Sequence, residues 1–225
     1  MKEGIYLIDK PAGWTSFDVV AWFRNRMSDV GDRKKPRIKV GHSGTLDPFA
    51  TGLLIIMVGK KFTKRQSEFM KLDKDYEATL KLGFSSSTGD PEGEIIKNSK
   101  FEIRNLKRED IEQALKQFVG EIEQTPPVHS AIKIKGQRAY KKARKGEKFE
   151  MPKRKVTIYE LDLIDYKFPE VSFRVRCSSG TYVRTLGQDI AKTLGTVGYL
   201  TKLRRTQIGD YGISEAKGIK NYEKE

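Results

Sequence analysis

A glycine-rich loop between residues 41 and 52 carries the side chains best suited to chemistry. It reads Gly-His-Ser-Gly-Thr-Leu-Asp-Pro-Phe-Ala-Thr-Gly and runs directly into an apolar stretch, residues 53–58. Glycine lets a backbone approach a ligand closely, and Pro48 stiffens the turn after Asp47. The pattern therefore predicts one carboxylate, Asp47, presented to a ligand at the mouth of a buried strand. An Asx-turn, in which Asp47 bonds its own backbone, is the alternative interpretation.

Two further side chains could share a site with this carboxylate. Tyr76 begins a stretch in which apolar and polar residues alternate as far as Leu82, so it points to the buried side of a strand. A tyrosine there is either ordinary core packing or a stacking surface. Arg184 falls in the first turn of a predicted helix, where the helix dipole disfavours a cation. That position indicates a partner anion, and a solvated arginine is the alternative.

A strongly basic segment lies between residues 124 and 152. Its cations are Lys133, Lys135, Arg138, Lys141, Lys142, Arg144, Lys145 and Lys148. Like charges at this density repel one another, which predicts a mobile arm that orders on RNA. The cations would follow phosphates, while Tyr140, Gln137 and His129 could stack on bases or bond to them.

The overall composition points to the same class of partner. The chain has 225 residues, 44 Lys+Arg against 30 Asp+Glu, a net charge of +14 and a pI near 9.7. A pI this high is the expected electrostatic footprint of nucleic-acid binding. The single cysteine, Cys177, rules out an internal disulfide and fits a reducing compartment. No apolar run approaches the roughly 20 residues of a membrane span, so we expect a cytoplasmic protein without membrane contact.

Several cofactor and metal motifs fail on inspection. Gly59-Lys60 resembles the end of a phosphate-binding loop, but Leu54 and Lys61 stand where glycine and a hydroxyl residue are needed. The two histidines and one cysteine are scattered without zinc-site spacing. A dinucleotide-binding glycine fingerprint and a Gly-x-Ser-x-Gly nucleophile motif are also missing from the sequence. We therefore expect neither a cofactor nor a metal.

The elements that must position these residues alternate irregularly, without a repeating strand-helix-strand rhythm. Residues 53–58 are apolar on both faces, which predicts a central strand, and alternation places Cys177 on the core face of another. A helix is expected to start at Ser16 as N-cap, with Phe17 among its apolar residues. The other elements expected are strands over 5–8, 76–82 and 171–177, a helix from about 106 to Gly120, and a helix over 182–194 ended by Gly195.

Taken together, these residues resemble the tRNA pseudouridine 55 synthases, the TruB family. Matching segments, in order along nearly the whole chain, are 7–16, 41–52, 73–76 with 82–83, 90–93, 179–185 and 199–205. The resemblance implies an α+β pseudouridine synthase fold, with a mixed, mainly antiparallel central sheet flanked by helices and loops and an active-site cleft. It implies one catalytic domain over 1–225, an RNA-clamping thumb at about 124–152, and a short form without a C-terminal PUA domain.

The resemblance also implies a reaction and its residues. The family converts uridine 55 in the T-loop of tRNA to pseudouridine, by breaking the bond at N1, turning the base and rejoining it through C5. Asp47 matches the essential aspartate, which acts as a nucleophile or assists a glycal intermediate, and a carboxylate can form and leave such an adduct. Arg184 matches the arginine paired with it, which favours the charged form. Tyr76 matches the tyrosine that stacks on the base and is a candidate for removing the C5 proton.

RNA-binding residues follow from the same match. His42 aligns with the residue that enters the space left by the flipped nucleotide, and Lys10 and Leu203 align with pocket-lining positions. Tyr182 belongs to the matching 179–185 segment. The thumb cations assigned to RNA are Lys133, Arg138, Lys141 and Arg144. Their phosphate contacts would offset the few kcal/mol that base extrusion costs.

The expected partner is the T-arm of tRNA, bound by a monomer with no obligatory protein partner. Three alternatives stay open at this point. The chain could be a non-catalytic RNA-binding or RNA-folding module, because the basic arm alone would bind structured RNA. It could also be a relative of the guide-dependent rRNA pseudouridine synthases, which share the core of the loop, or a base-removing glycosylase.

Overall fold

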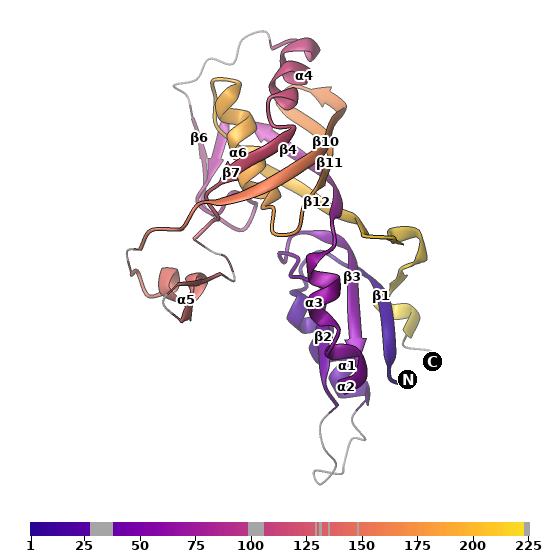
Figure 1. Ribbon diagram of the computed structural model, residues 1–225. Helices are drawn as coiled ribbons and strands as arrows, with labels where there is room; N and C mark the ends of the chain where they lie inside the picture. The colour runs from indigo at the N-terminus through magenta and orange to yellow at the C-terminus, as the bar shows by residue number, and fades with distance from the viewer. Residues whose placement is uncertain are drawn as a thin grey trace. The chain divides into compact units, whose positions relative to one another are not determined.

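The computed structural model describes residues 1–27, 38–98, 106–128, 130, 132–134, 136–147 and 149–222, shown in Figure 1. The side chains of Lys133, Tyr140 and Arg144 also lie outside this description. The helices are α1 (Ser16–Met27), α2 (Lys60–Thr63), α3 (Gln66–Lys71), α4 (Arg108–Lys116), α5 (Ala139–Arg144), α6 (Val183–Thr193), and the 3-10 turns η1 (Ile213–Glu215) and η2 (Ile219–Tyr222).

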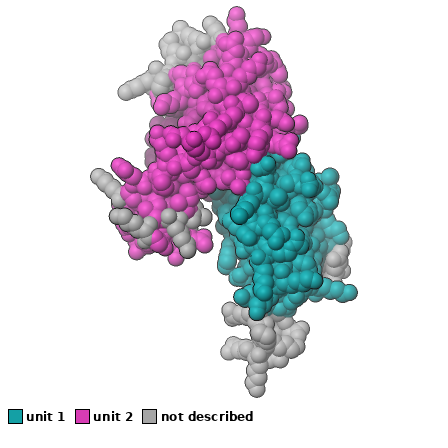
Figure 2. Space-filling view, in the orientation of Figure 1, with its two compact units in different colours: residues 1–77, 202–225 teal, residues 78–201 magenta. Residues whose placement is uncertain are grey.

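The strands are β1 (Gly4–Lys10), β2 (Val40–His42), β3 (Thr51–Val58), β4 (Lys74–Leu82), β5 (Phe84–Ser86), β6 (Ile95–Lys97), β7 (Gly120–Gln124), β8 (Lys133–Ile134), β9 (Gln137–Arg138), β10 (Arg154–Lys167), β11 (Glu170–Cys177), β12 (Gly198–Ile208), β13 (Tyr211–Gly212) and β14 (Lys217–Gly218). They fold into two compact units, coloured separately in Figure 2. Unit 1 contains residues 1–77 and 202–225, and unit 2 contains residues 78–201.

In unit 1 the strand order is β14-β1-β3-β12, with β2 also paired to β3 and β13 to β12. The β1–β3 pair is antiparallel, whereas β1–β14 and β3–β12 are parallel. Strands from near the two ends of the chain, β1 and β14, therefore lie side by side in this unit (Figure 1). Strand β3 separates two apolar clusters. Leu54, Ile56 and Val58 pack with α1 on one face, and Leu53, Ile55 and Met57 pack with Phe69 of α3 on the other. The predicted central strand is confirmed.

The start of α1 corrects one expectation. The predicted N-cap at Ser16 is wrong, because Thr15 fills that position. The Asp18 N–H donates to the Thr15 hydroxyl at 3.0 Å, and the Thr15 N–H donates to the Asp18 carboxylate at 2.8 Å, a reciprocal capping box. Ser16 is instead a buried first residue of the helix. The inward face consists of Val19, Val20 and Phe23, while Phe17 is 60% exposed.

In unit 2 the strand order is β12-β4-β11-β10-β7. The long β10 pairs antiparallel with β11 and with β7, and α4 and α6 belong to the same unit. Cys177 is 1% exposed at the end of β11, which confirms it as a core residue. Helix α6 ends as predicted, with Gly195 following at a φ of 72°.

Helix α4 is shorter than the periodicity predicts. It ends at Lys116, and residues 117–119 continue only in i to i−3 bonds, so Phe118 lies beyond the helix. Gly120, expected to terminate the helix, instead begins β7 with a φ of 110°. Because β7 begins at Gly120, residues 117–119 form the turn that connects α4 to this strand. Apolar periodicity alone does not predict that turn.

The fold class is the one expected, α+β with a mixed and mainly antiparallel central sheet. Most strand pairs described are antiparallel, and only β1–β14 and β3–β12 run parallel among those whose direction is given. Within the part of the chain that the structure describes, no helix is long and apolar enough to cross a membrane. The single-domain assignment over 1–225 stays a prediction.

Candidate active site

The loop that carries Asp47 is fastened on both sides of this residue. Lys10, at the end of β1, is completely buried, and its ammonium donates to the carbonyls of Pro11 (2.9 Å), Trp14 (2.6 Å) and Pro48 (3.2 Å). The Gly13 N–H also donates to the Pro48 carbonyl, at 2.9 Å. The turn after β1 is thereby joined to the residue that follows Asp47.

Two buried serines fix the residues that precede Asp47. Ser16 of α1 donates to the Leu46 carbonyl at 3.1 Å and accepts from the Leu46 N–H at 2.8 Å. Ser43 exchanges two bonds with Ile55 of β3, one through its N–H at 3.0 Å and one through its hydroxyl at 3.3 Å. The carbonyl of Asp47 itself accepts from the Ala50 N–H at 3.1 Å. All of these bonds leave the main chain of the loop restrained while the Asp47 residue stays partly exposed.

A second buried cation, Arg205 of β12, also contacts this loop. Its Nε donates to the Leu53 carbonyl at 2.7 Å and its Nη2 to the Gly44 carbonyl at 3.2 Å. Arg205 is not among the site residues predicted from the sequence. The available signal was an arginine at the end of the matching 199–205 segment, between Leu203 and Ile208, which are both buried.

His42, Tyr76 and Leu203 belong to unit 1 together with Asp47. Nδ1 of His42 accepts from the Gly44 N–H at 3.2 Å, and its carbonyl accepts from Gln66 at 2.9 Å, so the ring is oriented by the loop that it begins. Tyr76 in β4 is 8% exposed, and Leu203 in β12 is 7% exposed. Their roles in stacking and pocket lining stay predictions.

Arg184 and Tyr182 lie in unit 2, at the start of α6. The Arg184 guanidinium donates to the Asp90 carboxylate at 2.8 Å and to the Thr88 carbonyl at 2.9 Å. An anion partner, expected from the place of Arg184 in the first helical turn, is therefore present and is Asp90. The further pairing of Arg184 with Asp47, which the family resemblance implies, stays a prediction. Tyr182 is held by Gln124, whose amide bonds both its N–H (3.0 Å) and its carbonyl (3.3 Å).

The basic segment forms a small β8–β9 hairpin followed by α5. Arg138 and Lys141 are exposed, as phosphate contacts require. Lys142 forms an ion pair with Glu147 at 2.7 Å, and this bond lowers the pKa of the Glu147 carboxyl. The residues His129, Lys135 and Lys148, and the side chains of Lys133, Tyr140 and Arg144, lie outside the described part, so their roles stay predictions.

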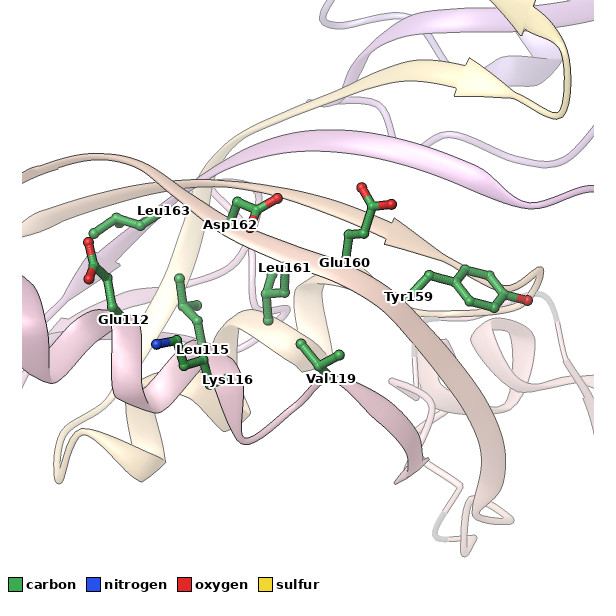
Figure 3. A pocket seen from close by; sticks show the side chains of 9 residues that line it. All are labelled: Glu112, Leu115, Lys116, Val119, Tyr159, Glu160, Leu161, Asp162 and Leu163. Carbon is green, nitrogen blue, oxygen red and sulfur yellow. The ribbon is translucent and has the colours of Figure 1, made fainter.

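A groove of about 440 Å³ in unit 2 does not involve these residues. It runs between α4 and β10, and Figure 3 shows the side chains of both elements that line it. Its lining combines apolar side chains such as Leu115 and Leu161 with charged ones of both signs, namely Glu112, Lys116, Glu160 and Asp162. No predicted site residue lines it. Among the described residues, no group of three His, Cys, Asp or Glu side chains could hold a metal ion.

In unit 1, bonds from other elements restrain the main chain on both sides of Asp47. A family model described as TruB family pseudouridylate synthase (N terminal domain) matches residues 33–183, which include the loop, Tyr76 and the start of α6. The chain belongs to the TruB family of pseudouridylate synthases. Its Asp47, Tyr76 and Tyr182 all lie within the matched range.

Individual members of the TruB family are similar over most of this chain. The tRNA pseudouridine synthase B of Parabacteroides distasonis is 47% identical over 206 residues, covering 92% of this chain and 86% of that protein. The protein of the same name from Flavobacterium johnsoniae is 44% identical, covering 99% of this chain and 96% of its own length.

A solved structure, a Cbf5-Nop10-Gar1 complex, contains a chain with a TM-score of 0.70 and 26% identity to this TruB-family chain. The match covers 96% of this chain and 52% of that one. This TruB-family chain therefore spans about half the length of its structural neighbour and shares its fold.

Proposed function

We propose that this TruB-family protein converts uridine 55 in the T-loop of tRNA to pseudouridine, with Asp47 as the catalytic carboxylate. The observation that carries the proposal is the restraint of the loop, in which Lys10 and Ser16 hold the residues on either side of Asp47. Two curated relatives named tRNA pseudouridine synthase B, similar over nearly the whole chain, support the substrate. Pseudouridine synthases are isomerases, so the reaction needs no oxidant and no group donor.

The reaction replaces one glycosidic bond by another within the same nucleotide. The bond between N1 and C1′ breaks, the uracil turns, and C5 bonds to C1′, while the C5 proton leaves and N1 gains a proton. Asp47 would assist either as a nucleophile or by helping to form a glycal intermediate, because a carboxylate can add and leave again. Arg184 would favour its ionised form. Tyr76, buried near the start of β4, would stack on the extruded base and is the candidate for removing the C5 proton.

Several residues would hold the RNA. The exposed Arg138 and Lys141 of the basic segment, with Lys133 and Arg144, would contact phosphates, and His42 would fill the space left by the flipped nucleotide. Tyr182, Lys10 and Leu203 would line the RNA site. Since the ammonium of Lys10 is bonded to three carbonyls, its part would be to shape that site. We further propose a cytoplasmic monomer that acts as one catalytic domain and needs no protein partner.

The test is tritium release from tRNA labelled at uridine C5. The wild-type protein should release tritium and leave the RNA chain intact. Asp47→Asn should abolish release while keeping tRNA affinity, because it changes the charge and almost no volume. Asp210→Asn, which alters an exposed turn carboxylate of the same unit, should behave as wild type.

The alternatives give different outcomes in the same assay. A glycosylase would leave an abasic site, and a binding module would bind tRNA without release. A guide-dependent enzyme would be inactive on tRNA alone. Turnover retained in Asp47→Asn would contradict the catalytic assignment.

A further inference from the structure

We infer that Arg205 is a positioning residue, which fixes the main chain of the Asp47 loop through bonds to its carbonyls. The inference rests on the proposed function for its kinetic consequence, but the contacts that carry it lie entirely within unit 1. Arg205 does not reach the base or the sugar in this role. It acts through the carbonyls of Gly44 and Leu53, which lie on either side of Asp47 in the chain.

The backbone of β12 approaches the end of the loop unusually closely. Gly52 pairs with Arg205 in the parallel β3–β12 register and with Lys10 in the antiparallel β1–β3 register. A Cβ placed on Gly52 would stand 2.3 Å from the Arg205 carbonyl oxygen and 2.7 Å from its nitrogen. Gly52 also has a φ of 103°. Only glycine fits here, and the close approach lets the Arg205 side chain start directly beside the loop.

From that position the guanidinium bonds one residue within the loop and one residue directly after it. Nε bonds the Leu53 carbonyl, where β3 begins its buried run, and Nη2 bonds the Gly44 carbonyl, three residues before Asp47. Guanidinium nitrogens in one rigid plane fix two acceptors relative to each other, which the flexible ammonium of lysine cannot do. Together with Ser16 on Leu46 and Lys10 on Pro48, carbonyls 44, 46, 48 and 53 all accept bonds from side chains outside the loop.

The choice of a buried arginine for these bonds indicates a role in positioning the loop rather than only in stabilising the fold. Arg205 is 1% exposed, and no carboxylate among the described residues forms an ion pair with it. Burying a guanidinium that binds only carbonyls is costly, and an apolar side chain would fill the same space at lower cost. The neighbouring Arg204 is partly exposed and bonds side chains instead of loop carbonyls. It donates to the Asp9 carboxylate through two nitrogens at 2.7 and 3.1 Å and to the Thr51 hydroxyl at 3.3 Å. The two adjacent arginines therefore have different roles, since Arg205 bonds main-chain carbonyls and Arg204 bonds side chains.

The experiment compares Arg205→Met and Arg205→Lys with Arg204→Met, the matched control on the same strand. Single-turnover pseudouridine formation, tRNA affinity and hydrogen exchange of the amides in residues 42–53 are measured for each folded variant. Because small misplacements of reacting groups cost rate rather than binding, we expect Arg205→Met to lose about 100-fold in rate with tRNA affinity unchanged. Exchange in residues 42–53 should become faster. Arg205→Lys should recover the fold but only part of the rate, and Arg204→Met should retain the wild-type rate.

A rescue measurement keeps the test decisive if Arg205→Met is unstable. Guanidinium ion added at non-denaturing concentration to Arg205→Ala should restore part of the rate, and should not change the rate of Arg204→Ala. Wild-type rate in either Arg205→Met or Arg205→Lys, with unchanged exchange in residues 42–53, would overturn the inference. If the wild-type protein itself formed no pseudouridine, the proposed function would fail. The exchange data alone would then decide whether Arg205 fixes the loop.

Discussion

Arg184 and Asp90 form an ion pair inside unit 2, with 2.8 Å between guanidinium nitrogen and carboxylate oxygen and side chains only 6% and 3% exposed. The carboxylate is itself held, since its other oxygen accepts from the Thr88 hydroxyl at 2.5 Å and from the Glu92 N–H at 3.0 Å. The Arg184 guanidinium also bonds the Thr88 carbonyl, so two residues of one turn orient it. The arginine proposed to support Asp47 is therefore already fixed within its own unit.

Removing Asp90 should therefore be costly. We expect Asp90→Ala to lower the free energy of unfolding by about 3 kcal/mol, because it leaves a buried guanidinium without its carboxylate. Urea unfolding followed by circular dichroism measures this change. Glu112→Ala removes the carboxylate of an ion pair in which Arg108 is 50% and Glu112 is 42% exposed, and it should cost at most about 1 kcal/mol. Equal costs for the two variants would show that the Asp90 pair behaves as a surface pair.

The two glycines Gly52 and Gly13 should respond differently to alanine. Gly13→Ala meets nothing within 4 Å and bears only the cost of its φ of 80°, about 1 to 2 kcal/mol. Gly52→Ala adds a clash with the main chain of Arg205, which cannot move aside as a side chain would, and should cost more than about 3 kcal/mol. Thermal or urea unfolding of both variants gives the comparison. A Gly52→Ala protein as stable as Gly13→Ala would mean that β3 and β12 can separate.

Asp189 of α6 should give the protein a measurable dependence on pH. Burial raises the pKa of the Asp189 carboxyl above its ordinary value near 3.8, although Lys192 partly opposes this effect. The folded state then holds the proton more tightly than the unfolded state. Stability from this group is present below the unfolded pKa and is lost as pH rises through the folded pKa.

Asp189→Asn, which never ionises, should therefore gain stability relative to wild type as pH rises above about 4. Urea unfolding midpoints of the two proteins between acidic and neutral pH measure this difference. A difference that stays constant over this range would contradict the expected titration.

The sequence predicted the elements whose patterns extend over many residues. The uniformly apolar 53–58 run gave the central strand, alternation gave the core side of Cys177, and Gly195 gave the end of α6. Boundaries set by single contacts were missed. Thr15 rather than Ser16 caps α1, because Ser16 is drawn into bonds with Leu46, thirty residues away in the chain. The residues next to Ser16 in the sequence do not indicate a partner so far away in the chain.

In the candidate site, too, the features that form a local pattern were predicted, and those that depend on single contacts were not. The loop and Asp47 were visible because glycine, proline and one carboxylate occur together in a short stretch. The pocket-lining role expected of Lys10 stays a prediction, and the sequence did not indicate that its ammonium bonds the carbonyls of Pro11, Trp14 and Pro48. Arg205 was not assigned a role at all. Both are buried cations held by main-chain carbonyls, and carbonyls are present at every position of any sequence. A side chain whose partners are backbone atoms therefore leaves no pattern that sequence reasoning can recognise.

If the basic segment binds phosphates, its cations should contribute to the salt dependence of tRNA affinity. Each cation that neutralises a phosphate contributes about 0.7 to 0.9 to the slope of log affinity against log salt concentration. The double variant Arg138→Gln and Lys141→Gln removes two exposed cations and should lower the slope by about 1.5. Fluorescence anisotropy titrations at several salt concentrations measure it. Lys155→Gln serves as the control, because Lys155 lies outside the segment and pairs with Glu121 at 2.7 Å. Its slope should match wild type, and equal losses in both variants would mean that general charge, rather than this segment, binds the phosphates.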